Sequence, residues 1–141
     1  MFKIGLEAEL NGNIKLKWGG KVAGYSKGDS LFTKIMKGQI PADLVYEDEH
    51  CICINDIHPQ APTHVLIIPR KPIPMVAKAE PEDQSLLGAL MLAAGKIAKQ
   101  LGVEEAFRLV VNNGEGAGQT VFHLHIHLLA NKKFDEGSLN R

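Results

Sequence analysis

The chain has 141 residues, of which 45% are hydrophobic and 23% charged, and its 16 lysines and arginines balance its 16 aspartates and glutamates. This length suffices for one buried core and is too short for two ordinary domains. The composition excludes a disordered or fibrous protein. Because the net charge is zero, the chain offers no general attraction to nucleic acid or to an anionic membrane, and we expect neither as a partner.

The sequence contains no feature of a secreted or membrane protein. No apolar run approaches the roughly 20 residues of a membrane helix, and residues 1–30 lack the basic and then apolar order of a secretory signal. The two cysteines, Cys51 and Cys53, are expected to be reduced thiols. We therefore expect a cytoplasmic protein, with the nucleus as a further location if the source is a eukaryote.

The first elements in chain order are an extension and a short helix. Residues 1–28 combine glycines with short lysine-containing stretches and predict an N-terminal extension that is weakly ordered or loosely strand-forming. An added strand or a targeting role is the alternative for this segment. Asp29 and Ser30 can cap a helix that ends at Gly38 and carries on one face Leu31, Phe32, Ile35 and Met36. The main domain is expected to span 29–130, followed by a polar C-terminal tail at 131–141.

The rest of the domain alternates short strands with one long helix. Apolar and β-branched runs predict a meander of three strands at 44–46, 51–54 and 65–68. Apolar residues at helical spacing predict a helix that starts at Pro81 and ends at Gly102. Two further strands, 107–112 and 121–129, flank a glycine-rich loop at 113–119 and form a hairpin. These elements predict an α+β domain with an antiparallel meander sheet, one short helix and one long helix.

Three histidines alternate with apolar residues in the last predicted strand. Because strand side chains alternate between faces, His123, His125 and His127 are expected on one face, with Leu124, Ile126 and Leu128 on the other. An imidazole titrates near pH 6.5, so both its nucleophilic neutral form and its acidic protonated form are accessible near neutral pH. A phosphate site shared by these imidazoles is therefore geometrically possible, and an attack by an imidazole would need no metal.

A metal centre is the main alternative for this row, because two histidines separated by one residue on a strand can share a zinc ion. The lack of carboxylates around the row and of a Cys-x-x-Cys pair disfavours this interpretation. Hydrogen-bonded packing is the other alternative, and three imidazoles in strict alternation disfavour it.

Polar residues near the row fit a nucleotide site. Glycines at 114, 116 and 118 allow the backbone to adopt positive φ and to approach an oxyanion, and Asn112, Gln119 and Thr120 are neutral donors beside it. His64 could be a fourth imidazole, although spacing alone does not place it. Asp56 is either a turn residue or a carboxylate that binds ribose hydroxyls.

The segment His123-Leu-His125-Ile-His127-Leu-Leu129 resembles the defining motif of the histidine triad (HIT) superfamily, and its surroundings resemble the Hint branch of nucleotide-binding hydrolases. The resemblance extends over about 29–130, through Asp56-Ile-His-Pro-Gln-Ala-Pro-Thr-His64, Ser85-Leu-Leu-Gly, Val110-Val-Asn-Asn-Gly114 and Gly118-Gln-Thr120. It implies a HIT-like fold, a homodimer with a sheet that continues across the interface, and no cofactor or metal.

The resemblance also implies a role for each matching residue. His125 would be the nucleophile, His123 and His127 would orient it and contact the phosphate region, and His64 would support the central ring by hydrogen bonding. Asp56 and Ile57 would contact ribose and base, Asn112 would contact phosphate, and Gly118, Gln119 and Thr120 would form the wall for phosphate and leaving group. The base pocket would be lined by Leu31, Phe32, Ile35 and Ile54.

The implied activity is hydrolysis of purine nucleoside phosphoramidates or acyl-nucleotidylates, conjugates of AMP or GMP, through a nucleotidyl-histidine. The alternatives are a purine-nucleotide-binding or scaffold module with little turnover and a diadenosine polyphosphate hydrolase. Thr120 replaces a serine frequent at that position, and Asn131-Lys-Lys-Phe-Asp-Glu136 differs from the tryptophan-containing tail of animal Hint proteins. The extension at 1–28 has no counterpart in the resemblance.

Overall fold

The computed structural model describes residues 5–8, 14–18, 21–25 and 29–139. The first three of these ranges form a separate antiparallel sheet in the order β1 (Gly5–Ala8), β2 (Ile14–Trp18) and β3 (Lys21–Tyr25). Strand formation was among the expectations for this extension. The rest of the prediction for 1–28 concerns residues outside the described ranges.

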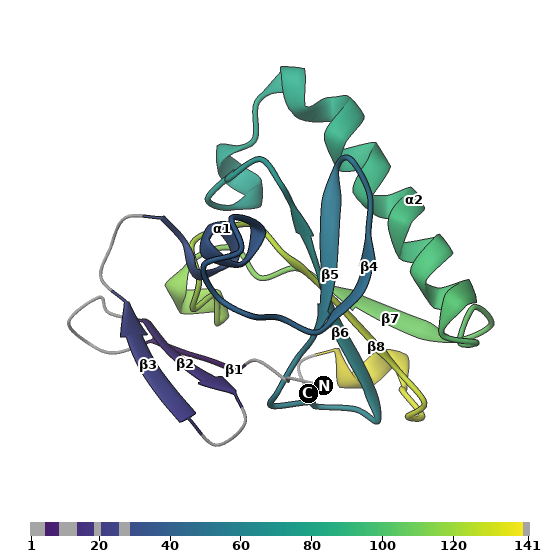
Figure 1. The fold of residues 1–141 in the computed structure, drawn as a ribbon. Coiled ribbons are helices and arrows are strands. Elements are labelled where there is room, and N and C mark those ends of the chain that lie inside the picture. The colour runs from purple at the N-terminus through teal and green to yellow at the C-terminus, as the bar shows by residue number, and fades with distance from the viewer. Residues whose placement is uncertain (1–4, 9–13, 19–20, 26–28, 140–141) are drawn as a thin grey trace.

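The main domain is built on a five-stranded antiparallel sheet (Figure 1). Its strands are β4 (Leu44–Glu47), β5 (Cys51–Asn55), β6 (Thr63–Pro69), β7 (Phe107–Val110) and β8 (Ile126–Ala130). The order β4-β5-β6-β8-β7 confirms the meander of the first three strands and the hairpin of the last two. However, β8 rather than β7 pairs with β6, so β7 lies at the edge and the whole sheet is not a simple meander.

Two α-helices pack on this sheet, α1 (Leu31–Met36) and α2 (Gln84–Gln100). The predicted cap of α1 is confirmed, because the Ser30 side chain accepts a hydrogen bond from the Thr33 N–H at 3.0 Å. Gly38 and Gly102 have φ of 73° and 72° at the ends of the two helices, as C-terminal caps require. Four short 3₁₀ turns complete the domain, at Val76–Lys78, Pro81–Asp83, Glu115–Ala117 and Glu136–Ser138.

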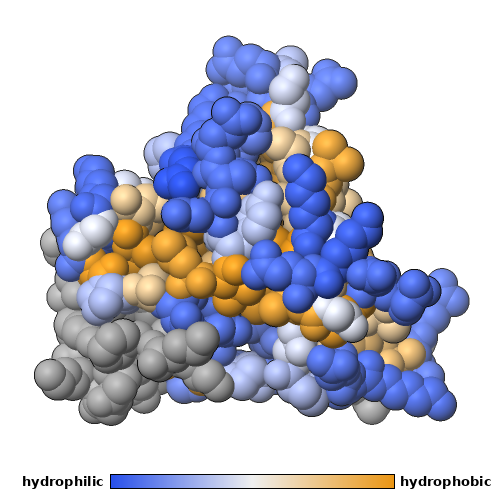
Figure 2. Space-filling view, turned by 45° about the vertical axis from the view of Figure 1, so that its right-hand side comes forward, coloured by the Kyte–Doolittle hydropathy of each residue, from blue (hydrophilic) through white to orange (hydrophobic). Residues whose placement is uncertain are grey.

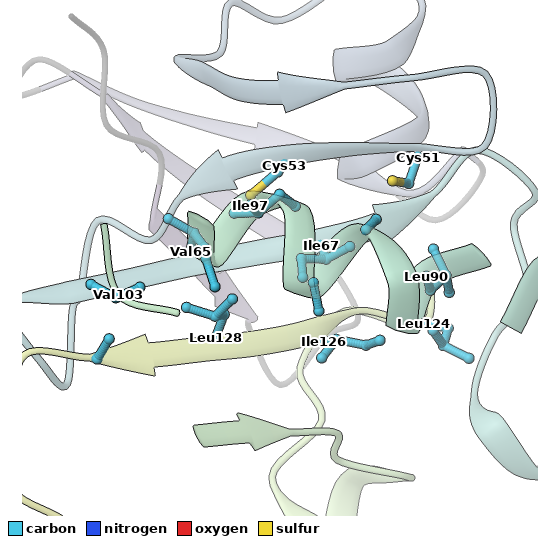
Figure 3. Packing of buried hydrophobic residues seen from close by; sticks show 14 of the residues in the cluster. Cys51, Cys53, Val65, Ile67, Leu90, Ile97, Val103, Leu124, Ile126 and Leu128 are labelled. Carbon is cyan, nitrogen blue, oxygen red and sulfur yellow. The ribbon is translucent and has the colours of Figure 1, made fainter. Parts of the chain in front are cut away.

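The sheet is buried on both faces. Leu90, Ile97 and their neighbours on α2 pack on one face against Val65, Ile67 and Leu128 (Figure 3). On the other face, Phe32 and the rest of α1 pack against a second cluster that includes Ile52, Ile54, Leu66 and Ile68. Burial of both faces explains why β5 and β6 are continuous apolar runs rather than alternating ones.

The last predicted strand begins later than the sequence suggests. β8 starts at Ile126 instead of residue 121, and β7 ends at Val110 instead of residue 112. β6 ends at Pro69, and the chain beyond it contains Pro72 and Pro74, which have no N–H to offer a neighbouring strand. Residues 121–125 lie outside the strand, and the Leu124 N–H donates to the Ile73 carbonyl at 2.7 Å.

Most of the face drawn in Figure 2 is polar, and apolar side chains gather in a band across its middle. In the described part of the chain, the large apolar residues that stay exposed are Leu44, Val76, Met91, Leu92, Val111, Phe122 and Leu139. None of the helices among the described residues has the length and apolar character of a membrane span.

Candidate active site

The imidazoles of four histidines meet on the face of the sheet that carries α1. His64 lies on β6 and His127 on β8, and the register pairs Leu66 with His127. His64 and His127 therefore project from the same face, and their rings are joined by a hydrogen bond of 2.9 Å between Nε2 and Nδ1. The ring of His125 comes next, with its centroid 5.1 Å from that of His127. The structure thus places His64, whose position the sequence leaves open, beside the row. Its hydrogen bond goes to His127, so the support of the central ring of His125 that the resemblance implied is wrong as a direct contact.

His125 is held so that one ring nitrogen stays available. Its Nδ1 is 2.8 Å from the carbonyl oxygen of His123, and only an N–H can make this bond. In the neutral ring Nε2 then carries the lone pair, and no described residue forms a hydrogen bond with it. The edge of Phe32 packs against the same ring at a centroid distance of 5.2 Å. This orientation would allow Nε2 of His125 to act as a nucleophile.

His123 is a supporting residue, because both of its ring nitrogens have protein partners. Nε2 donates to the Pro69 carbonyl at 2.7 Å, and Nδ1 lies 2.6 Å from the Ser30 hydroxyl. The side chain is completely buried, with an exposed fraction of 0%. This arrangement fits the orienting role expected for His123 and leaves it no ring nitrogen for a phosphate.

A chain of hydrogen bonds fixes the proton position on His127. The backbone N–H of Gln60 donates to Nδ1 of His64 at 3.0 Å, so the proton of a neutral His64 ring is on Nε2. That Nε2–H donates to Nδ1 of His127, whose own proton must then be on Nε2. Oδ2 of Asp56 lies 3.5 Å from the same Nε2 of His64. His127 can therefore present an N–H to a bound substrate.

All four imidazoles are neutral at pH 7 in the free protein. Burial lowers the pKa of His64, His123 and His125 below the usual value of 6.5. Burial, together with the neighbouring His125 and His64 rings, lowers the pKa of His127 to about 4. The neutral state keeps His125 in its nucleophilic form without an added base.

The same geometry disfavours a metal centre. Asp56, His64 and His127 offer ligand atoms within 4.8 Å of one another. However, the Gln60 N–H occupies the Nδ1 lone pair of His64, so Nε2 carries a proton and has no lone pair for a metal. Cys51 and Cys53 are free thiols on the opposite face of the sheet, among the residues packed on α2. Burial raises the pKa of Cys51 to about 12, which makes a thiolate ligand unfavourable.

Two of the three glycines named in the glycine-rich loop adopt the positive φ that the sequence suggested, and Gly116 does not. Gly114 and Gly118 have φ of 87° and 94°. A Cβ atom added at Gly118 would lie 3.8 Å from Nδ2 of Asn112, so the two residues are adjacent. No described residue forms a hydrogen bond with the Asn112 side chain, and Thr120 is exposed. Both side chains are available to a ligand.

Gln119 braces this loop instead of pointing out of it. Its Oε1 accepts from the Gly114 N–H at 2.8 Å, and its Nε2 donates to the carbonyls of Pro74 and Val121 at 2.8 and 2.9 Å. The side chain is 2% exposed. Since both polar atoms of the amide already have partners, Gln119 shapes this loop, and a direct contact with a ligand would require it to release a bond.

The residues expected in the base pocket lie together, on α1 and at the end of β5. All four are buried in one cluster: Leu31, Phe32, Ile35 and Ile54. Ile57 packs against this cluster and, like Asp56, is half-buried at its border. Oδ1 of Asp56 accepts from the His58 N–H at 2.8 Å, which is a turn interaction, while Oδ2 faces His64. The turn interpretation of Asp56 is therefore supported, and its contact with ribose stays a prediction.

Comparison with known proteins identifies the family that carries these alternating histidines on this fold. The HIT domain family matches residues 37–134. The chain belongs to the HIT family. An uncharacterized HIT-like protein of Synechocystis is 53% identical over 106 residues, which cover 75% of this chain and 93% of that protein.

Two solved HIT structures illustrate the relation. A HIT family hydrolase from Legionella pneumophila has a TM-score of 0.74 and 42% identity, covering 77% of this chain and 97% of that one. A histidine triad nucleotide-binding protein from Candida albicans has a TM-score of 0.65 and 28% identity, covering 77% and 85%. The open antiparallel sheet with its helices is thus the HIT fold.

Three groups at this HIT site were not anticipated from the sequence. The sequence indicates Ser30 only as a helix cap, and it does not reveal the backbone groups of Gln60 and Pro69 as partners of the histidines. Backbone donors and acceptors leave no trace in residue types, so no sequence pattern could have identified the last two. Ser30 could have been found only by knowing that α1 begins beside His123.

Proposed function

We propose that this HIT protein hydrolyses purine nucleoside phosphoramidates or acyl-nucleotidylates through a nucleotidyl intermediate on His125. The observation that carries the proposal is the orientation of His125, whose Nδ1–H is bound to the His123 carbonyl and whose Nε2 lone pair has no protein partner among the described residues. The description of the Legionella relative as a HIT family hydrolase supports hydrolysis, and that of the Candida relative supports nucleotide binding.

The proposed first step forms a bond between Nε2 of His125 and the α-phosphorus and breaks the bond from phosphorus to the leaving amine. An anionic phosphate beside His127 favours its protonated form, because an opposite charge within about 4–6 Å raises an imidazole pKa. On protonation, Nδ1 of His127 gives up the bond that it accepts from His64 in the free protein. The His127 imidazolium then gives its Nε2 proton to the departing nitrogen. A carboxylate leaving group needs no such proton.

In the second step a water molecule attacks phosphorus and displaces His125, while neutral His127 accepts a proton from that water. The nucleoside monophosphate leaves and His127 is again protonated. Two in-line displacements retain the configuration at phosphorus. We assign the non-bridging oxygens to Asn112, Gly118 and Thr120, with Gln119 shaping their wall, the ribose to Asp56, and the base to Ile57 and the α1 pocket.

The experiment that tests this function traps the intermediate. Protein mixed in excess with an adenosine phosphoramidate and quenched in base should carry one adenylyl group, mapped by mass spectrometry to His125. Turnover should be faster with the phosphoramidate than with diadenosine polyphosphate, a comparison that separates the proposal from the alternative hydrolase. Binding of AMP without any adduct or turnover would instead identify a nucleotide-binding module.

We also propose that two copies pair through the edge strand β7, with residues 29–130 as the HIT domain of each. Among the described strands β7 is paired only with β8, and it lies near the exposed Val111. Met91 and Leu92 on α2 are 58% and 70% exposed, as residues of an apolar interface would be in one isolated copy.

Sedimentation should detect this dimer at micromolar concentration. The variant Leu92→Glu is expected to raise the dissociation constant by more than about 100-fold, because it would bury a charge in an apolar interface. Val76→Glu alters another exposed apolar side chain, outside α2 and β7, and should leave the dimer intact. Equal dimer stability in both variants would contradict this interface.

A further inference from the structure

Ser30 makes a contact that its role as a helix cap does not require. Its Oγ lies 3.0 Å from the Thr33 backbone N, which is the capping bond, and 3.0 Å from the Thr33 hydroxyl. The same Oγ lies 2.6 Å from Nδ1 of His123, a residue 93 positions away in the chain. One hydroxyl thus connects the start of α1 to the histidine row.

The partners on the other side of the His123 ring set the direction of this contact. A carbonyl oxygen can only accept, so the bond between Nε2 and the Pro69 carbonyl places a proton on Nε2. In the neutral ring Nδ1 is then an acceptor, and the Ser30 hydroxyl donates to it. The Oγ in turn accepts from the Thr33 N–H, so that each polar atom of this buried junction has a partner.

The junction reaches the nucleophile through the main chain of His123. The carbonyl oxygen of His123 accepts the Nδ1–H of His125, and this bond leaves the lone pair on Nε2 of His125. Phe32 on the first turn of α1 contacts the rings of both His123 and His125, at centroid distances of 5.7 and 5.2 Å. A rotated His123 would therefore disturb both the hydrogen bond and the packing that orient His125.

We infer that Ser30 is a positioning residue, which fixes the neutral Nε2–H form and the orientation of His123 and through it the reactive nitrogen of His125. The kinetic part of this inference rests on the proposed function. The tautomer part does not, because it concerns the free protein. It also means that one hydroxyl connects α1, which carries most of the proposed base pocket, to the row that carries the proposed nucleophile.

The test compares four variants of the full chain. Ser30→Ala removes both the cap and the donor, whereas Ser30→Thr keeps both. Ser30→Asp keeps the cap, because its carboxylate accepts from the Thr33 N–H, but it cannot donate to His123. Lys37→Ala removes an exposed ion pair with Asp29 at the same helix and serves as the matched control for a change in helix stability.

Two readouts are measured for each variant, the ¹⁵N shifts of the His123 and His125 imidazoles without ligand and the kcat and KM for an adenosine phosphoramidate. Ser30→Ala should lower kcat about tenfold with KM changed less than about twofold, because a buried acceptor loses its donor. Ser30→Thr should restore kcat to within about twofold of the wild-type value. Ser30→Asp should place protons on both nitrogens of His123, since a carboxylate favours the imidazolium, and should lower kcat while the fold is kept.

If Ser30→Ala and Ser30→Asp both keep the wild-type tautomer of His123 and the wild-type kcat, the inference is wrong. An equal loss of kcat in Lys37→Ala would overturn it as well, because helix stability would then explain the effect. If the wild-type protein turns over no nucleotide conjugate, the proposed function fails, and the ¹⁵N shifts alone decide whether Ser30 sets the His123 tautomer.

Discussion

Replacement of His125 by alanine is expected to reduce phosphoramidate turnover by on the order of 10⁴-fold or more, because the variant has no atom that can form the covalent intermediate. The adenylyl adduct should disappear from the mass spectrum at the same time. Nucleotide binding should persist, since the α1 pocket and Asp56 are unchanged. The measurement is a single-turnover assay with a fluorogenic adenosine phosphoramidate, accompanied by AMP titration.

The control must separate loss of the nucleophile from loss of the fold, because the His125 side chain is only 6% exposed and its truncation leaves a cavity. Thermal unfolding and binding of AMP report the fold of His125→Ala. His50→Ala removes an imidazole that is exposed and outside the site, and it should keep the wild-type rate. Hydrolysis by His125→Ala at the wild-type rate would show that another group attacks phosphorus.

The parts of the fold with strong local patterns were predictable. The apolar spacing on α2 and its end at Gly102 act within the helix itself, and the structure has them as expected. The predicted start at Pro81 is wrong by three residues, because Pro81–Asp83 forms a 3₁₀ turn and α2 begins at Gln84. The same holds for the opposite orientation of Leu124, Ile126 and Leu128, which pack on the α2 side while His127 faces α1. Short-range periodicity is a property of residue types and therefore legible in a sequence.

The pairing of strands that lie far apart in the sequence was harder to predict. No local pattern decides whether β7 or β8 lies beside β6, because either order buries the same apolar residues. The late start of β8 at Ile126 depends on its pairing with β6, which begins opposite Ile67, far away in the sequence. The alternation of the three histidines was correct as a pattern, although only His127 lies within the strand.

The chemical roles within the triad depend on groups that residue types do not reveal. The alternation makes His123, His125 and His127 look equivalent, whereas the structure differentiates them by their partners. The Pro69 carbonyl and Ser30 occupy both nitrogens of His123, the His123 carbonyl takes one nitrogen of His125, and His64 takes one nitrogen of His127. Those backbone and side-chain partners, rather than spacing, distinguish the proposed nucleophile from the proposed acid.

Acidification is expected to destabilise the protein steeply between about pH 6.5 and 4. Burial holds the pKa of His64, His123 and His125 below 6.5, and that of His127 at about 4. In the unfolded chain these imidazoles titrate near 6.5. Within this window the unfolded state therefore binds more protons than the folded state, so the free energy of unfolding rises with pH.

His127 illustrates the sign and the size of the effect. Its contribution is fully present above pH 6.5 and is lost as the pH falls toward its folded pKa of about 4. The loss amounts to at most about 3 kcal/mol, because each pH unit between the unfolded and folded pKa values corresponds to about 1.4 kcal/mol. Urea unfolding of the wild-type protein at several pH values between about 4 and 7.5 measures how steeply the free energy of unfolding changes with pH. This slope should exceed the value for the uptake of one proton, because four imidazoles contribute.

The matched variant His127→Gln removes one titrating group. The free energy of unfolding of this variant should therefore change less steeply with pH, by up to the value for one proton, whatever its stability at pH 7. An unchanged slope in His127→Gln would show that His127 is already protonated in the folded protein at these pH values. That result would also contradict the hydrogen-bond order from Gln60 to His64 to His127, since an imidazolium has no lone pair with which to accept from His64.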